Sequence, residues 1–267
     1  MYRQFYGLSS PVFDKTLPPE KLYRSKAFSE ALARVQYAVS TRDIMCLVGE
    51  IGTGKTSVVR ALRETLQDGK HKLAYVGNPT IRARGVLSAA AYQFGLELGL
   101  SLPRILRELT HHLAELKQRG FTAVAVFDEI QLADFSLIET LRMLTGHELD
   151  SQTLLAIVLV GHESFLDRLK LSAYQSLNQR IGVRYRLTPL DLSETLAYVE
   201  HHLKVAGANR QLFEDDALEH IYHATKGVPR KVNLLCTNAL LAGAAEERKV
   251  IGIGIVKRVL NDLDGTF

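Results

Sequence analysis

The fold is decided where the sequence reads Gly49-Glu50-Ile51-Gly52-Thr53-Gly54-Lys55-Thr56. This segment matches the pattern G-x-x-x-x-G-K-[ST], in which successive backbone N–H groups turn inward and hold phosphate oxygens at the start of a helix. An apolar run at 44–48 precedes the segment, and apolar residues at 58, 59, 62 and 66 follow it at helical spacing. The order of strand, glycine-rich loop and helix predicts a nucleotide-binding P-loop.

The side chains of this loop point to ATP and Mg²⁺ as its ligands. Lys55 is expected to reach the β- and γ-phosphates, and the Thr56 hydroxyl is expected to hold Mg²⁺. The residues expected to contact ATP in the loop are Gly49, Gly52, Thr53, Gly54, Lys55, Thr56 and Ser57.

A second apolar run, at 123–127, ends in Asp128 and Glu129. We expect Asp128 to orient the hydrated Mg²⁺ together with Thr56, and Glu129 to polarise the attacking water. Such a pair favours hydrolysis over transfer of the phosphate to a small molecule. The alternative is a strand that merely ends in two solvated acids.

Strand-like and helix-like patterns alternate through the middle of the chain. The strand-like runs lie at 44–48, 73–77, 123–128, 154–161 and 183–187. This alternation predicts an α/β P-loop fold with a mainly parallel five-stranded sheet. Residues 191–267 show helical patterns without a convincing strand, which predicts a small helical lid. We therefore expect three parts: an N-terminal lead-in and helix packing on the core (1–42), a nucleotide-binding α/β domain (43–190) and the helical lid (191–267).

The composition is that of a globular protein. The chain has 267 residues, of which 46% are hydrophobic and 23% charged, which excludes collagen-like, disordered and disulfide-scaffold classes. Its two cysteines, Cys46 and Cys236, lie far apart in the sequence and suggest reduced thiols in a cytoplasmic protein. No apolar stretch approaches the roughly 20 residues of a membrane helix and no leader is evident, so we expect no membrane contact.

The positive charge is concentrated in the first half of the chain. Residues 1–122 carry 18 basic and 10 acidic residues, a balance of +8, whereas residues 123–267 carry 15 basic and 19 acidic residues, a balance of −4. The distribution fits either an uneven solvated surface or a surface that faces a polyanion. Within the first half, Arg82 and Arg84 are candidates for salt-sensitive contacts with DNA phosphates. Two solvated arginines beside a helix start are the alternative.

Two further arginines are candidates for contact with the γ-phosphate. Arg180 lies just before the last strand-like run and could project from one subunit into the nucleotide site of a neighbour. An ordinary surface arginine is the alternative. Arg230 follows Pro229 in the first turn of an expected helix, where the helix dipole disfavours a cation. That placement favours a phosphate-sensing role.

Together these segments resemble the AAA+ ATPases of the group shared by ExeA-type secretion ATPases and TniB/TnsC-type transposition helper ATPases. The segments that carry the resemblance are Phe5-Tyr6-Gly7-Leu8, the phosphate loop, Asn78-Pro79-Thr80, Phe127-Asp128-Glu129-Ile130-Gln131, Leu159-Val160-Gly161, Gln179-Arg180-Ile181 and Gly227-Val228-Pro229-Arg230.

The resemblance implies residue roles as well as a fold. It implies Arg180 as the arginine finger, Arg230 as the second sensor, and assembly into rings or helical filaments. This sequence departs from the family where members often have Gly-Gln-Pro-Glu, because it reads Gly161-His162-Glu163-Ser164. We therefore expect His162 at the place of the first sensor, and slow hydrolysis.

Two functions compete within this resemblance. Secretion ATPases of the ExeA type continue into a membrane span and a periplasmic peptidoglycan-binding region, whereas transposition helpers consist of the AAA+ module with little else. Because the sequence ends with the expected lid, we expect a transposition helper that binds ATP, oligomerises on double-stranded DNA without sequence preference and recruits or activates a transposase. An ExeA-type secretion-assembly ATPase acting through protein partners is the alternative.

Overall fold

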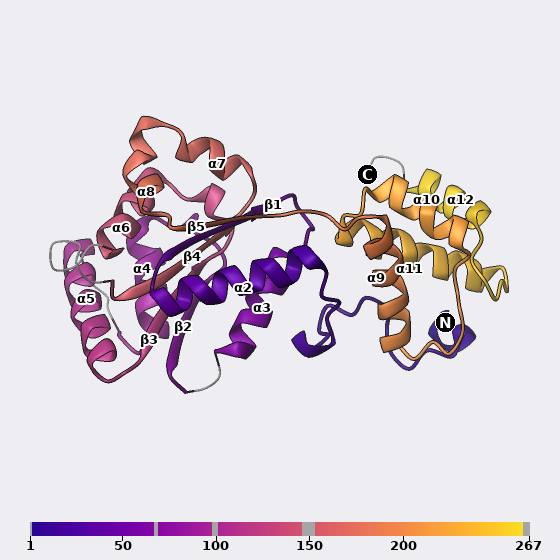
Figure 1. Ribbon diagram of the computed structural model, residues 1–267, viewed down its shortest axis with the longest axis horizontal. Coiled ribbons are helices and arrows are strands. Elements are labelled where there is room, and N and C mark those ends of the chain that lie inside the picture. The colour runs from indigo at the N-terminus through magenta and orange to yellow at the C-terminus, as the bar shows by residue number, and fades with distance from the viewer. Residues whose placement is uncertain (1, 67–68, 98–100, 146–152, 264–267) are drawn as a thin grey trace. The chain divides into compact units, whose positions relative to one another are not determined.

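A five-stranded parallel sheet forms the centre of the α/β part of the chain (Figure 1). The computed structural model describes residues 2–66, 69–97, 101–145 and 153–263. The sheet order is β2-β3-β4-β1-β5, which confirms the expected fold class. The strands are β1 (Ile44–Gly49), β2 (His71–Val76), β3 (Thr122–Phe127), β4 (Leu155–Gly161) and β5 (Val183–Leu187).

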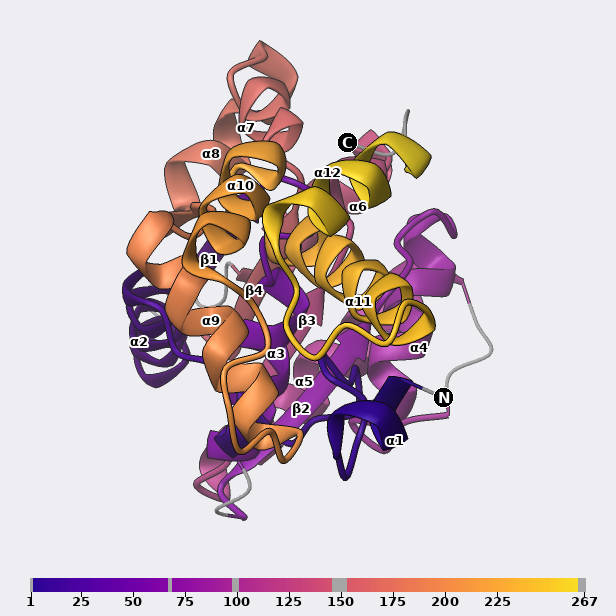
Figure 2. The ribbon, with the colours of Figure 1, turned by 90° about the vertical axis from the view of Figure 1, so that its right-hand side faces the viewer.

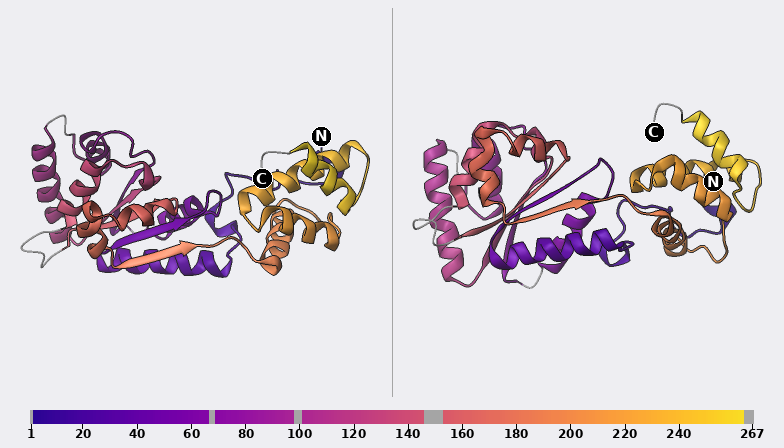
Figure 3. Two further views of the ribbon diagram at one scale, coloured as in Figure 1. Left: turned by 90° about the horizontal axis from the view of Figure 1, so that it is seen from above. Right: turned by 45° about the horizontal axis from the view of Figure 1, so that its top comes forward.

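Helices cover both faces of this sheet, which is why β1 and β4 are buried along their whole length. One face carries α2 (Lys26–Thr41) and α3 (Lys55–Thr65), as Figures 1 and 3 show. The other face packs in one apolar core against the remaining helices of this part. They are α4 (Ala83–Gln93), α5 (Leu102–Gln118), α6 (Phe135–Thr145), α7 (Ser164–Leu169) and α8 (Gln175–Arg180), with the short 3₁₀ turns η2 (Ile130–Leu132) and η3 (Ser172–Tyr174).

The register of the strands fixes where the functional loops emerge. Val48 of β1 lies opposite Gly161 of β4, and Phe127 of β3 lies opposite Leu159 of β4. Because all strands run in the same direction, the loops that follow β1, β3 and β4 leave the sheet at one edge. In open α/β sheets this carboxyl edge is where ligands bind.

The chain divides into two compact units. The α/β unit comprises Phe28–Ile51 and Lys55–Leu187, and the helical unit comprises Met1–Ala27, Gly52–Gly54 and Thr188–Phe267. The helical unit contains α1 (Tyr2–Tyr6), η1 (Pro19–Lys21), α9 (Leu192–Val205), α10 (Asp215–Thr225), α11 (Pro229–Ala245) and α12 (Ile253–Asp262), most of which face the viewer in Figure 2. The limits 1–42, 43–190 and 191–267 stay a prediction.

The helical unit has its own apolar core, in which residues from both ends of the chain meet. Tyr6 and Leu8 pack in one cluster with Cys236 and Ile251, and the Tyr6 hydroxyl donates to the carbonyl oxygen of Arg248 at 3.0 Å. Local signals define its helices: Asp191 makes a capping box at the start of α9, and α11 begins with Pro229. Among the described residues, none of the helices is both long enough and apolar enough to cross a bilayer.

Candidate nucleotide site

The glycine-rich loop connects β1 to α3 in a conformation suited to phosphate. Gly52 and Gly54 adopt φ values of +92° and +105°, a region that other residues rarely enter. Helix α3 begins at Lys55, so its first N–H groups, including those of Thr56 and Ser57, have no partner within the helix. Lys55 Nζ donates to the carbonyl oxygens of Gly49 and Glu50, each at 2.9 Å. The loop therefore offers N–H groups and a lysine ammonium together, which fits a bound phosphate chain.

Gly52 lies against Arg230 within the helical unit. The Arg230 N–H donates to the Gly52 carbonyl oxygen at 3.2 Å, and a Cβ added at Gly52 would lie 2.7 Å from the Arg230 Cβ. Arg230 is the second residue of α11, as expected from the sequence. Thr53 in the same unit is buried, with 6% of its surface exposed. The middle of the phosphate loop thus requires a glycine both for its φ value and for this close approach.

Asp128 follows β3 directly and is held rigidly. Its side chain is 5% exposed, and its Oδ1 accepts from the Glu129 N–H at 2.9 Å. Its Oδ2 accepts from the Tyr75 hydroxyl, also at 2.9 Å. Burial and this bond to Asp128 raise the pKa of Tyr75, so the phenol remains a donor at neutral pH. An oriented, buried carboxylate at the carboxyl edge of the sheet fits the magnesium role expected for Asp128.

Glu129 has a backbone conformation that few non-glycine residues adopt. Its φ and ψ are 54° and 36°, in the left-handed region, and its side chain is exposed. The carboxylate oxygen Oε2 accepts from Gln131 Nε2 at 2.6 Å. The amide oxygen of the same glutamine accepts from the His162 N–H at 2.9 Å. Gln131 thereby connects Glu129 to the residue that follows β4.

His162 lies at the expected place, directly after β4. Its Nδ1 accepts from the Ser164 N–H at 3.2 Å and lies 3.1 Å from the Ser164 hydroxyl. Because a backbone N–H can only donate, the neutral imidazole carries its proton on Nε2. The ring can therefore offer one N–H donor, which fits the first-sensor role expected for His162.

Two residues of this site were not expected from the sequence as site residues. Tyr75 comes from β2 and Gln131 from η2, and neither had an expected role. Tyr75 reaches Asp128 because β2 pairs with β3, with Val76 opposite Phe127. Gln131 lies two residues beyond Glu129, so a polar residue at this spacing after the acidic pair was the available signal.

The arginines near β5 differ in their surroundings. Arg180 ends α8 and is partly exposed. Arg184 donates to the carbonyl oxygen of Asn178, and Arg186 forms a two-pronged ion pair with Glu163. Both strand arginines are thus engaged within the chain, which leaves Arg180 as the candidate for contact with a neighbouring subunit.

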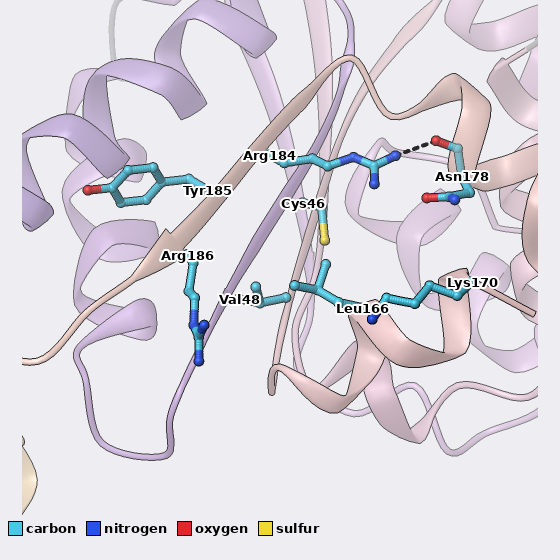
Figure 4. Close-up of a pocket in the computed structure, with 8 residues that line it drawn as sticks. All are labelled: Cys46, Val48, Leu166, Lys170, Asn178, Arg184, Tyr185 and Arg186. Carbon is cyan, nitrogen blue, oxygen red and sulfur yellow. Dashed lines mark hydrogen bonds between the residues drawn. The ribbon is translucent and has the colours of Figure 1, made fainter.

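A pocket of about 280 Å³ opens beside these arginines, between β5 and helices α7 and α8 (Figure 4). Cys46 and Leu166 are among its apolar lining residues, while Arg184, Arg186 and Lys170 supply positive charge. Lys170 pairs with Asp167 at 2.8 Å, so all three cations have partners. The lining includes neither the phosphate loop nor the acidic pair, and the pocket is therefore separate from the nucleotide site.

Arg82 and Arg84 lie at the start of α4, and both are exposed. Ile81 beside them is 57% exposed. The placement agrees with a loop that a partner can reach, but it does not identify the partner.

Comparison with known proteins agrees with this site. A family model described as an AAA domain matches residues 37–169. General secretion pathway protein A of Aeromonas hydrophila is 35% identical over 270 residues, covering 99% of this chain and 49% of that protein. The chain therefore spans about half the length of this relative.

Solved structures give the same fold. Cdc6p of Pyrobaculum aerophilum superposes with a TM-score of 0.74 at 19% identity, over 94% of this chain and 70% of that chain. The ORC2 protein of Aeropyrum pernix gives a TM-score of 0.69 at 19% identity, over 94% and 71%. At this identity the likeness concerns the fold alone.

Proposed function

The protein is an ATPase with the α/β P-loop AAA+ fold, and from this premise we propose that it is a secretion-assembly ATPase that acts through protein partners. One observation carries the proposal: nearly the whole chain aligns at 35% identity with a protein named for the general secretion pathway. The motor would drive or control the assembly of a protein complex, since AAA+ modules convert nucleotide state into changes of contact.

This proposal reverses the order of the two readings reached from the sequence. The preference for a transposition helper depended on where the sequence ends, and half of the matching relative lies outside the aligned region. The length therefore does not separate the two functions. Exposed Arg82 and Arg84 support a second candidate function, in which the protein assembles on double-stranded DNA and acts on a transposase.

The site residues have the following proposed roles in ATP hydrolysis. The loop N–H groups and Lys55 hold the phosphates, and Thr56 and Asp128 hold Mg²⁺. The bound ion would offset negative charge on the β- and γ-phosphates. Glu129 takes a proton from water as the water oxygen bonds to the γ-phosphorus. The bond from that phosphorus to the β–γ bridging oxygen breaks, and ADP leaves with the electron pair.

The remaining candidates would link hydrolysis to assembly. Arg180 of an adjacent subunit would contact the γ-phosphate and stabilise a ring or filament, whereas Arg230 and His162 would contact it from within the chain. Loss of the γ-phosphate removes these contacts and weakens the assembly. ATP therefore favours the assembled state and hydrolysis releases it.

Two substitutions test this scheme. Glu129→Gln keeps the side chain's size but removes its basicity, so we expect turnover to fall by about a hundredfold or more and ATP-bound assemblies to persist. Lys55→Ala removes a phosphate ligand, so we expect it to prevent assembly. Light scattering after ATP addition, with phosphate release measured in parallel, gives both quantities.

Glu247→Gln is the matched control, because Glu247 is also exposed and also has a positive φ, of 55°. It should assemble and disassemble like the parent protein. Equal disassembly rates for Glu129→Gln and the parent would contradict the proposed link between hydrolysis and release.

A further inference from the structure

We propose that Gln131 is a positioning residue that fixes the carboxylate of Glu129 and connects it to the end of β4. The Glu129 side chain is exposed, so packing does not define its rotamer. Its contact with Gln131 Nε2, at 2.6 Å, is short enough to be a strong charge-assisted hydrogen bond. This bond selects one orientation of a side chain that would otherwise be free to turn.

The amide of Gln131 can have only one orientation. The His162 N–H is an obligatory donor and requires the amide oxygen, which it meets at 2.9 Å. The amide nitrogen must then face Glu129, where it meets the acceptor that it needs. Reversing the amide would place two donors against each other at His162 and two acceptors against each other at Glu129.

Neighbouring groups hold Gln131 itself in place. Arg168 of α7 donates to the carbonyl oxygens of Gln131 and Ala133, at 2.5 and 2.8 Å, and also to the Tyr174 hydroxyl at 2.7 Å. On the side of β4, a Cβ added at Gly161 would lie 2.5 Å from Gln131 Oε1. The absence of a side chain at Gly161 therefore makes room for the amide, and the arginine fixes the backbone that carries it.

This arrangement has two consequences for hydrolysis. Gln131 engages Glu129 Oε2, which leaves Oε1 as the oxygen that accepts the proton of water. In addition, a shift of His162 on contact with the γ-phosphate would be transmitted to Glu129 through a single side chain. The inference depends on the role proposed above for Glu129.

Two substitutions separate the halves of this connection. Gln131→Ala removes both hydrogen bonds. Gln131→Glu keeps an oxygen for the His162 N–H but places a second carboxylate against Glu129. We expect kcat to fall by about tenfold or more in both variants, because a misplaced base loses effective proximity to water. The Kd for a non-hydrolysable ATP analogue should change by less than about twofold, since no phosphate ligand is removed.

Gln211→Ala is the matched control, because Gln211 also donates its amide to a carboxylate, that of Asp215, at 2.9 Å. It should leave kcat unchanged. The decisive measurement repeats Gln131→Ala in a Glu129→Gln background, where a residue that acts only through Glu129 should cause no further loss.

The outcomes are distinct. An unchanged kcat in both Gln131 variants overturns this inference, and so does a full additional tenfold loss in the Glu129→Gln background. If Glu129→Gln itself leaves turnover unchanged, the proposed role of Glu129 fails first. Gln131→Glu retains the bond to His162, so it carries the test if Gln131→Ala does not fold.

Discussion

At the residue scale, the two acids after β3 are each held by one side chain from elsewhere in the α/β unit. Tyr75 donates to Asp128 Oδ2, and Gln131 donates to Glu129 Oε2. Such partners orient a ligand or base without touching the substrate, and their removal commonly weakens metal affinity or activity by one to two orders of magnitude. Tyr75 is therefore as testable as the motif residues.

We expect Tyr75→Phe to raise the Mg²⁺ concentration needed for half-maximal ATP hydrolysis by about tenfold. The substitution removes only the hydroxyl, so Asp128 keeps its burial but loses the donor that fixes Oδ2. A magnesium titration at saturating ATP measures the shift.

Tyr92→Phe provides the control, because Tyr92 is 68% exposed on α4 and the same hydroxyl is removed there. Equal magnesium titrations for Tyr75→Phe and the parent protein would show that the hydroxyl does not orient the metal ligand.

The sequence predicts some residues of the site and not others, for a physical reason. The loop at 49–56 and the acids Asp128 and Glu129 belong to contiguous segments whose local order of strand, loop and helix carries the chemistry. Tyr75 joins the site through strand pairing, and Gln131 joins it through a contact with His162, 31 residues away. Contacts of this kind depend on register, which a single sequence does not specify locally.

At the element scale, the strands are predictable because their apolar runs are continuous. The run at 44–48 is β1, and the run at 154–161 is β4 apart from its first residue. The edge strand β2 begins at His71, two residues before the expected 73, because pairing with Thr122 extends it beyond the apolar residues. Propensity thus locates a strand, whereas its neighbours decide its ends.

Helix α9 contains a group that makes the helical unit sensitive to acid. His202 is 6% exposed and lies 4.4 Å from Tyr198 and 5.2 Å from Phe13, measured between ring centroids. Burial, with a smaller contribution from neighbouring His201, lowers the pKa of His202 to about 4 from its ordinary 6.5. The folded chain therefore resists a proton that the unfolded chain accepts.

We expect the free energy of unfolding of this unit to fall as the pH drops from about 6.5 towards 4, by up to about 3 kcal/mol. Below pH 6.5 the unfolded state binds a proton at His202 while the folded state does not, so the difference grows until the folded pKa is reached. Urea unfolding at pH 7.5, 6 and 5 measures the change.

His202→Phe should reduce this pH dependence, because an aromatic ring remains while the titrating group is lost. His111→Phe is the control, since the His111 side chain is 75% exposed. A pH dependence that is the same in His202→Phe and the parent would assign the acid sensitivity to other groups.

At the scale of the whole molecule, the grouping of the chain ends is the feature hardest to predict. Tyr6 bonds to Arg248, 242 residues away, and Met1–Ala27 joins the helical unit. The first 25 residues carry no long periodic pattern, so their partners follow from the tertiary structure rather than from local propensity. By contrast, the two kinds of unit, one α/β and one helical, follow from the change in pattern near residue 190.

The charge of the whole molecule provides the test between the two candidate functions. The formal net charge is +4, and Arg82→Ala with Arg84→Ala lowers it to +2, which is +4 minus two charges. Arg104→Ala with Arg107→Ala, two exposed positions of α5, gives the same net charge and serves as the control. For a secretion-assembly ATPase we expect ATP-dependent assemblies of one size with and without random-sequence double-stranded DNA, and equal, weak DNA binding by both double variants. A DNA partner predicts instead that affinity falls with salt and that only the first variant loses about two units of the slope of log affinity against log salt, one per phosphate contact. That second result, with ATP affinity unchanged, would contradict the secretion assignment and favour assembly on DNA, because loss of general charge would affect both variants alike.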